Sequence, residues 1–309
     1  MANVTDGEKQ STTQEFFCET GFEARQKMLI LISSFPLAIV AFLGNAVIIA
    51  ALRNVSTLHP SSKILLVCLA CTDLGVGLIS HPLLIGYLMS EGHLKICSYL
   101  GIFFYTIGFT LCGVSLLTLT AISVDRLLAL LLRLRYKDVV TVKRARILVV
   151  AIWLVSPAGV VVVLYNFRIA AGLSFAVVVP CVAISTLCYT KIYHTLRHHQ
   201  TQAREQIHQG KPHGRGIQLK IARYKKTVSS VLWVQITLLV CYLPYLTVAF
   251  IYSISRQVTP ALRDAVAVTL SLLLCNSSLN PFLYCWKIRE VKQAVKETVR
   301  QFWCFSRQL

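Results

Sequence analysis

The stretch CSYLGIFFYTIGFTLCGVSLLTLTAISVDR, residues 97–126, decides the fold. Its first 28 residues, 97–124, carry no charge, and Asp125 and Arg126 then follow side by side. A helix needs about 20 apolar residues to cross the hydrocarbon core of a bilayer, so this stretch is long enough to span a membrane. The adjacent acid and base mark the place where the span would reach water.

The whole chain has the composition of a membrane protein. Of its 309 residues, 55% are hydrophobic and 14% are charged, and the mean hydropathy is +0.64. Soluble domains usually contain about 25% charged residues. Apolar runs predict an all-α bundle of seven membrane-spanning helices at about 28–52, 64–88, 98–132, 145–165, 172–196, 227–254 and 264–286. The first run has no basic segment and no cleavage site near the chain start, so it is interpreted as a span rather than a signal peptide.

The charge distribution predicts the orientation of the bundle. The net charge is +18, and an odd number of spans places the two termini on opposite sides of the membrane. If the N-terminus is outside, 24 of the 31 Lys and Arg residues fall in inner segments, which is the asymmetry that the positive-inside rule describes. We therefore expect a multi-pass protein of the cell membrane with a cytoplasmic C-terminus, and no nucleic-acid partner.

Three parts follow from this topology: an extracellular tail at 1–27, the bundle at 28–286 and a cytoplasmic segment at 287–309. The tail contains a glycosylation sequon at Asn3. The inner stretch 197–223 is polar and basic and is predicted to be a loop.

The cytoplasmic segment begins with a predicted amphipathic helix. Residues 288–303 place apolar side chains on one stripe and lysines on another, which is typical of a helix lying on the membrane surface. Cys304 follows it and is a candidate for palmitoylation. The alternative is a free cytosolic thiol.

A few polar residues interrupt the apolar spans. Polar groups at the centre of a bilayer are costly, so they usually face the bundle interior and partner one another. In this sequence they are Asn45, Asp73, Ser115, Asn276, Ser277, Asn280 and Tyr284.

The order of the short motifs resembles the rhodopsin-like family of G-protein-coupled receptors over about residues 28–302. The motifs are GN at 44–45, LACTD at 69–73, DR at 125–126, Trp153, CYLP at 241–244 and NPFLY at 280–284. The resemblance implies a receptor, not an enzyme, that transmits an extracellular ligand signal to heterotrimeric G-proteins, with arrestin as a further potential partner. The alternatives are a seven-helix scaffold or decoy receptor and, less favoured, a transporter.

The resemblance implies a sodium ion as an allosteric ligand and no other cofactor. The matching residues are Asp73, Ser115, Asn276, Ser277 and Asn280. A small hard cation prefers oxygen ligands, which these side chains supply together with one formal charge. The alternative is an Asp73 carboxyl group that is protonated, or that is satisfied by hydrogen bonds from Asn45 and Asn280.

The resemblance also implies an activation switch. Its residues are Asp125, Arg126, Tyr189, Tyr242, Pro244, Asn280, Pro281 and Tyr284. In this interpretation Asp125 holds Arg126 at rest and releases it into a G-protein cavity on activation. Leu127 stands where the family usually has Tyr, and Tyr224 stands near where many members have a second carboxylate. We therefore expect a loosely held resting state with some basal signalling.

No ligand subgroup of the family matches. There is no lysine in 264–286 for retinal, no acid between Cys97 and Val124 for an amine, and Ala249 stands where adenosine receptors have Asn. The outer half of the bundle is apolar and aromatic, which favours a lipid or another hydrophobic small molecule, with a neutral peptide second. The candidate pocket residues are Phe104, Tyr105, Gly108, Phe109, Cys112, Tyr242, Tyr245 and Phe250.

The cysteine pattern departs from the family as well. The family usually joins the top of its third helix to the second outer loop, but the corresponding loop here is short and has no cysteine. The predicted pair is Cys18 with Cys97, and the alternative is two free thiols.

Overall fold

The computed structural model describes residues 24–55, 58–90, 93–132, 135–165, 167–208, 233, 236–255, 259–287, 292–297 and 300. Within these ranges the regular structure is helical and contains no strand. Asn3, Cys18, Tyr224 and Cys304 lie outside the described residues, and so does the side chain of Tyr284. Predictions that rest on them stay predictions.

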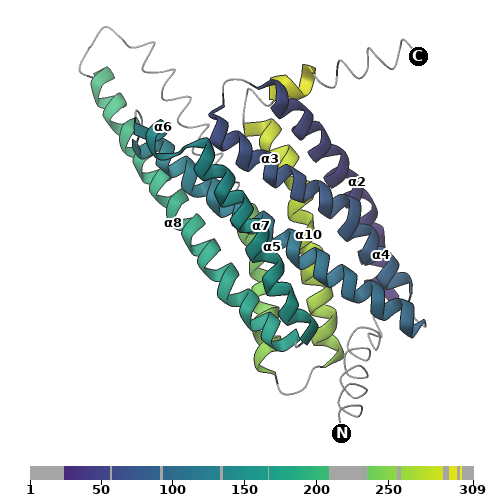
Figure 1. The fold of residues 1–309 in the computed structure, drawn as a ribbon. Helices are drawn as coiled ribbons and strands as arrows, with labels where there is room; N and C mark the ends of the chain where they lie inside the picture. Colours follow the sequence, from purple (N-terminus) through teal and green to yellow (C-terminus); the bar gives the residue numbers. More distant parts are fainter. Residues whose placement is uncertain are drawn as a thin grey trace.

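The chain folds into a seven-helix bundle (Figure 1). Six helical stretches are long and apolar enough to cross a membrane: Lys27–Asn54, Pro60–Met89, Leu94–Leu132, Ile169–His199, Ile236–Ile254 and Pro260–Leu283. The remaining helix of the bundle is α7, which lies between α5 and α8 in the chain. It has 24 residues and begins with a basic turn. The first turns of α7 have a lower hydropathy than the rest of the helix because they contain Lys143, Arg144 and Arg146.

The elements follow one another without sheet or second domain in the described part. They are α2 (Ala24–Asn54), α3 (Pro60–Gly75), the π-turn η1 (Val76–Ser80), α4 (His81–Met89), α5 (Leu94–Leu132), α6 (Tyr136–Val139), α7 (Val142–Tyr165), α8 (Phe167–His208), the helix at Ile236–Ile254, and α10 (Pro260–Lys287).

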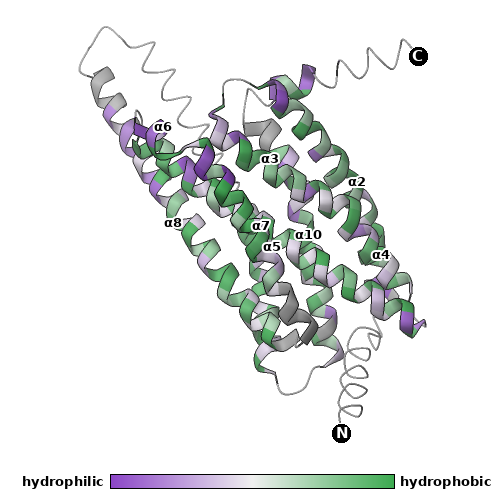
Figure 2. Cartoon of the chain, in the orientation of Figure 1, coloured by the Kyte–Doolittle hydropathy of each residue, from purple (hydrophilic) through white to green (hydrophobic). Residues whose placement is uncertain are grey.

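Helix α5 lies at the centre of the packing. It contacts α3, α4, α7 and α8, while α2 contacts α3 and α10 (Figure 1). The helix at Ile236–Ile254 reaches α5 through the ring pair Phe109–Tyr245 and reaches α8 through Phe175–Phe250. Apolar residues cover the flanks of the bundle between two more polar ends (Figure 2), as expected of a protein whose solvent is lipid.

The second span contains a π-turn, which the apolar pattern did not reveal. Pro82 has no N–H group to donate along the helix, and the His81 N–H group bonds to the Val76 carbonyl oxygen, five residues back. A π-turn accommodates one extra residue and rotates the segment beyond it. The side chains of α4 therefore point in different directions from those that an unbroken helix would give them.

Two glycines allow close helix approach at this level of the bundle. A Cβ atom on Gly77 would lie 2.6 Å from the Phe42 backbone nitrogen, and one on Gly44 would lie 2.8 Å from Pro281 Cγ. Both distances are shorter than real contacts allow, so η1 and α10 pack against α2 only because these positions lack side chains.

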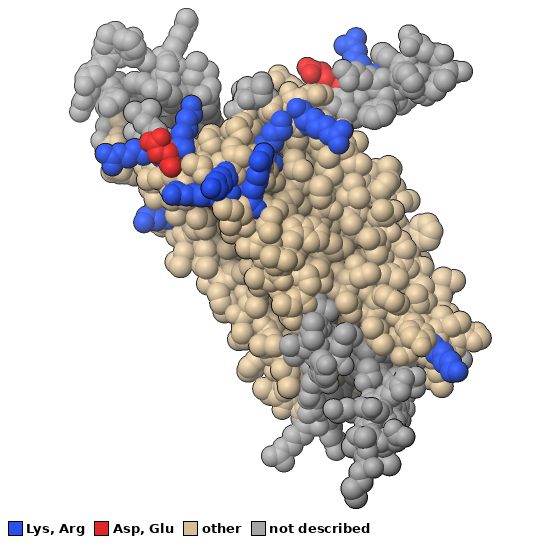
Figure 3. Space-filling model, viewed as in Figure 1, with Lys and Arg blue, Asp and Glu red and all other residues tan. Residues whose placement is uncertain are grey.

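Among the described residues in this view, Lys and Arg side chains gather at the end of the bundle where α5 and α10 finish (Figure 3). At the crowded end, Lys63 donates to the carbonyl oxygens of Arg53 and Val55, each at 3.2 Å. The one-sided charge that the sequence predicted is thus present in the fold.

Two segments differ in detail from the sequence-based prediction, and a third agrees with it. Helix α8 continues to His208, so residues 197–208 are helical and do not belong to a loop. Only residue 166 separates α7 from α8. Residues 292–297 of the expected surface helix are helical, as predicted, with Ala294 buried against Ala51 of α2 and Val55 just after it.

Candidate functional site

The first polar cluster lies inside the bundle around Asp73. Its carboxyl group is fully buried, and it accepts hydrogen bonds from Asn280 Nδ2 at 2.6 Å and from Ser115 Oγ at 3.3 Å. The Ser277 hydroxyl group lies beside the same carboxyl group. Asn276 is buried on the same helix. The structure therefore brings residues from α3, α5 and α10 together, and all of these partners are neutral oxygen or amide groups.

Asn45 does not donate a hydrogen bond to Asp73, although the alternative to a sodium ion assumes that it does. Its Nδ2 atom donates to the carbonyl oxygens of Ala41 (2.8 Å) and Ser277 (3.1 Å) rather than to Asp73. Its Oδ1 atom is buried and has no hydrogen-bond partner among the described residues. Since a buried unpaired oxygen costs about 1–3 kcal/mol, this position favours a bound cation or water.

The second polar cluster lies near the C-terminal end of α5. Asp125 is buried and accepts a 2.6 Å hydrogen bond from Tyr136 Oη and a 2.8 Å hydrogen bond from Ser62 Oγ. Arg126 is farther away, with Nε 3.8 Å from Asp125 Oδ2 and 38% of its side chain exposed. Asp125 is therefore held by two hydroxyl groups from α6 and α3 more closely than by its neighbouring arginine.

Tyr136 is well placed to remain a donor. Burial raises its pKa above the usual value near 10, and the hydrogen bond that it donates to Asp125 raises the pKa further. Its ring also contacts His59 edge-on, with centroids 4.9 Å apart. The hydroxyl group thus stays protonated at any physiological pH.

Tyr189 of the predicted switch lies near these groups. It is buried with Ile192 and Leu196 of α8, and Leu127 packs against the same cluster. The residue that replaces the family's tyrosine therefore joins an apolar contact between α5 and α8. The expected pairing of Tyr189 with Tyr284 stays a prediction, because the Tyr284 side chain is not described.

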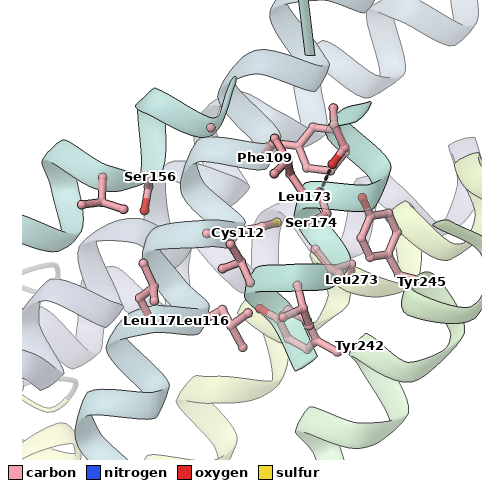
Figure 4. Close-up of a pocket in the computed structure, with 16 residues that line it drawn as sticks. Phe109, Cys112, Leu116, Leu117, Ser156, Leu173, Ser174, Tyr242, Tyr245 and Leu273 are labelled. Atoms are coloured by element: carbon pink, nitrogen blue, oxygen red, sulfur yellow. Dashed lines mark hydrogen bonds between the residues drawn. The ribbon is translucent and has the colours of Figure 1, made fainter. Parts of the chain in front are cut away.

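A cavity of about 140 Å³ lies among α5, α7, α8 and the helix at Ile236–Ile254 (Figure 4). Four of the predicted pocket residues line it: Phe109, Cys112, Tyr242 and Tyr245. Leu116 and Leu273 close its inner wall. None of the lining residues that the structure describes is Asp, Glu, Lys, Arg or His.

The other predicted pocket residues are distributed differently. Phe104, Tyr105 and Gly108 line a much smaller space that adjoins Phe109 and Cys112. Tyr105 also packs against Phe109, with ring centroids 6.0 Å apart. Phe250 requires a correction: it is 47% exposed on the outside of the bundle and packs against Phe175, 5.4 Å between centroids.

Among the described switch residues of the later helices, Tyr242, Asn280 and Pro281 are buried and Pro244 is partly buried. Tyr242 is 2% exposed and lines the cavity, with Pro244 two residues further on in the same helix. Pro281 is buried inside α10 beside Asn280. Cys97 is buried near the start of α5, and its predicted pairing with Cys18 stays a prediction because Cys18 is not described.

Sequence reasoning missed the two hydroxyl partners of Asp125. Tyr136 follows Asp125 by 11 residues and Ser62 precedes it by 63. One signal was available: Tyr136 is an aromatic residue in an otherwise charged inner segment, 135–138. Nothing local marked Ser62, since its contact forms only when α3 and α5 pack.

Comparison with known families matches residues 44–170 and 161–284 to a family model described as "7 transmembrane receptor (rhodopsin family)". Among individual relatives, the adenosine receptor A2b of Gallus gallus is 33% identical over 130 residues, which is 42% of this chain and 37% of that receptor. The adenosine receptor A2a of Canis lupus familiaris is 24% identical over 297 residues, 85% of this chain and 70% of that receptor.

Proposed function

The chain belongs to the rhodopsin family of seven-transmembrane receptors, and from that premise we propose that it senses a hydrophobic ligand outside the cell and activates heterotrimeric G-proteins inside it. The N-terminus would then be extracellular and the C-terminus cytoplasmic. The positive charge at the end of the bundle where α10 finishes supports this orientation.

The observation that carries the proposal is the arrangement around Asp125. A buried carboxylate is held by Tyr136 and Ser62, while Arg126 beside it is partly exposed at the basic end of the bundle. The Asp125 carboxylate can change partners when helices move, because only two strong hydrogen bonds hold it. Arg126 is then free to meet a partner protein.

The apolar cavity supports a hydrophobic ligand. Pockets bind through apolar walls and a few polar groups, and this cavity has apolar walls and no described charged residue. The relatives are named as adenosine receptors, but the buried Ala249 offers a methyl group where an amide would be needed to recognise a polar base. A lipid-like ligand therefore fits better than a nucleoside.

A sodium ion fits the cluster around Asp73. The oxygen atoms of Asp73, Ser115, Asn276 and Ser277 would hold it, with Asn280 as a donor to the carboxylate. The ion would supply positive charge to a buried acid whose described hydrogen-bond partners are neutral. The buried Asn45 Oδ1 atom, which has no hydrogen-bond partner among the described residues, supports this proposal.

A screen tests the receptor function. Cells that express the chain and report all four G-protein pathways would be exposed to a library of lipids, other hydrophobic molecules and adenosine. We expect a hydrophobic hit whose response is abolished by Arg126→Ala and kept by Arg53→Ala, which removes an exposed arginine at the same end of the bundle. A response that survives Arg126→Ala unchanged would refute the mechanism. A ligand that binds without a response in any pathway would favour the decoy alternative.

A further inference from the structure

The outer wall of the cavity is made of side chains on the lipid-facing surface. Val155 of α7 is 64% exposed, and Leu173 and Val177 of α8 are 45% and 48% exposed, yet all three line the cavity. Its inner wall is buried, with Tyr242 and Tyr245 each under 5% exposed. The cavity therefore opens sideways, between α7 and α8, toward the acyl chains.

The opening is kept clear by a glycine. Gly159 lines the cavity, and a Cβ atom added to it would meet nothing within 4 Å. Gly159 stands on α7 about one turn beyond Val155, so an added methyl group would fit without a clash and a longer side chain is expected to reach into the gap.

One hydroxyl group faces the cavity without a partner. Serine and threonine in membrane helices usually bond to a carbonyl oxygen one turn back, as Ser174 does with Ala170 at 2.8 Å. Ser156 Oγ is buried and makes no hydrogen bond among the described residues. It faces α5, where a Cβ atom on Gly113 would lie 3.5 Å from it, on the side of the cavity opposite Tyr242 and Tyr245 (Figure 4).

Size and depth limit what can bind. The volume of about 140 Å³ is close to that of an engineered apolar cavity of about 150 Å³ that holds one benzene molecule. Ser156 lies nine residues before the end of α7 at Tyr165, or about 14 Å along the helix at 1.5 Å per residue. A lipid whose head group stays at the surface would reach this depth with the middle of its chain.

We propose that an uncharged, mainly apolar molecule enters from the bilayer between α7 and α8 and inserts a group of about the size of benzene, with one hydrogen-bonding atom, beside Ser156. The rest of the molecule remains in lipid along the two helices. This inference rests on the proposed receptor function for its biological meaning, but the binding itself can be measured without a G-protein.

Photo-cross-linking in lipid nanodiscs tests the entry route. The probes are two uncharged monoacylglycerols with a diazirine and a terminal alkyne in the chain, one of which also has a hydroxyl group in mid-chain. On the full-length chain we expect the hydroxylated probe to label peptides that contain Leu173 and Val177. Gly159→Leu should reduce this labelling at least fivefold, and Gly172→Leu should leave it within twofold, since Gly172 also faces open space but does not line the cavity.

Further variants cover the remaining outcomes. If Gly159→Leu lowers the yield of folded protein, Gly159→Ala and Gly159→Val should show a smaller, graded loss of labelling. Ser156→Ala should abolish the preference for the hydroxylated probe. Equal labelling of the wild type and all Gly159 variants, or a preference that survives Ser156→Ala, would overturn the inference.

The same probes separate this inference from the receptor function. Labelling of the cavity without activation of any G-protein pathway would refute the receptor function and leave the site intact. Activation by a hydrophobic ligand without labelling of the cavity would refute the site and leave the receptor function intact.

Discussion

Tyr136→Phe removes one hydroxyl group from α6 and nothing else. That group donates the shortest hydrogen bond to Asp125, at 2.6 Å, and its oxygen lies 3.1 Å from Ser62 Oγ. The phenylalanine ring keeps the edge contact with His59. The substitution therefore tests the contacts of the hydroxyl group with Asp125 and Ser62 and leaves the ring packing in place.

The magnitude follows from the charge on the acceptor. A hydrogen bond to a charged group contributes about 1.5–3 kcal/mol, and about 1.4 kcal/mol changes an equilibrium tenfold. If the bond forms only at rest, its loss should raise the ratio of active to resting receptor about 10- to 150-fold. A receptor that is active ~0.1% of the time would then be active about 1–13% of the time.

Ligand-free nucleotide exchange is the assay. Membranes with equal amounts of surface receptor would be mixed with purified G-protein, and the rate of GTPγS uptake would be measured. We expect a rise for Tyr136→Phe and none for Tyr193→Phe, which removes the hydroxyl group of a partly buried tyrosine on α8. Ser62→Ala should also raise the rate, and the double variant should fall short of the sum of the two effects because both donors serve one carboxylate.

The dependence on pH gives a second check. A group with a raised pKa provides its stabilisation in full below its ordinary pKa and loses it only as the pH rises through the raised value. Since the pKa of Tyr136 is raised by burial and by the bond to Asp125, the difference between wild type and Tyr136→Phe should be constant between about pH 6 and pH 9. An unchanged or lower basal rate in the variant would refute the reasoning, since Asp125 would then not restrain the resting state.

Three further predictions concern residues inside the bundle. Asp73→Asn should make agonist affinity insensitive to the exchange of sodium for potassium, whereas wild-type affinity should fall in sodium by about 5-fold or more, the range of typical allosteric couplings; equal sensitivity in both would exclude the ion. Gly77→Ala should lower the melting temperature in detergent, because overpacking costs about 1–3 kcal/mol and the added methyl group meets backbone atoms of α2, while Gly172→Ala should not. Tyr245→Ala should weaken the response to a hydrophobic agonist, and Phe250→Ala should leave it unchanged if only the cavity-lining residue contacts the ligand.

Much of the fold could be predicted because a membrane-spanning helix needs an apolar run of about 20 residues, which can be recognised in the sequence. The run that ends at Asp125 gave α5, and the similar runs gave the other six helices. The cluster around Asp73 was predictable for a related reason: a buried acid needs partners, and few polar residues were available within the spans.

The rest depended on which face of each helix points inward. In a membrane the lipid-facing and core-facing sides are both apolar, so hydrophobic periodicity carries little information about orientation. Phe250 therefore looked equivalent to Tyr245, although the first is exposed and the second buried. The π-turn at Val76–Ser80 adds to the difficulty, since it rotates α4 relative to α3.

Helix α7 ends at Tyr165 and α8 begins at Phe167, so the chain connection between them is short. Consecutive Cα atoms are about 3.8 Å apart, so the helix ends can separate by no more than about 7 Å. Any widening of the gap must therefore be a scissor-like motion with its pivot where the two helices are joined. Molecules that reach the gap would then be selected by how deep they lie in the bilayer, and their concentration in water would matter much less.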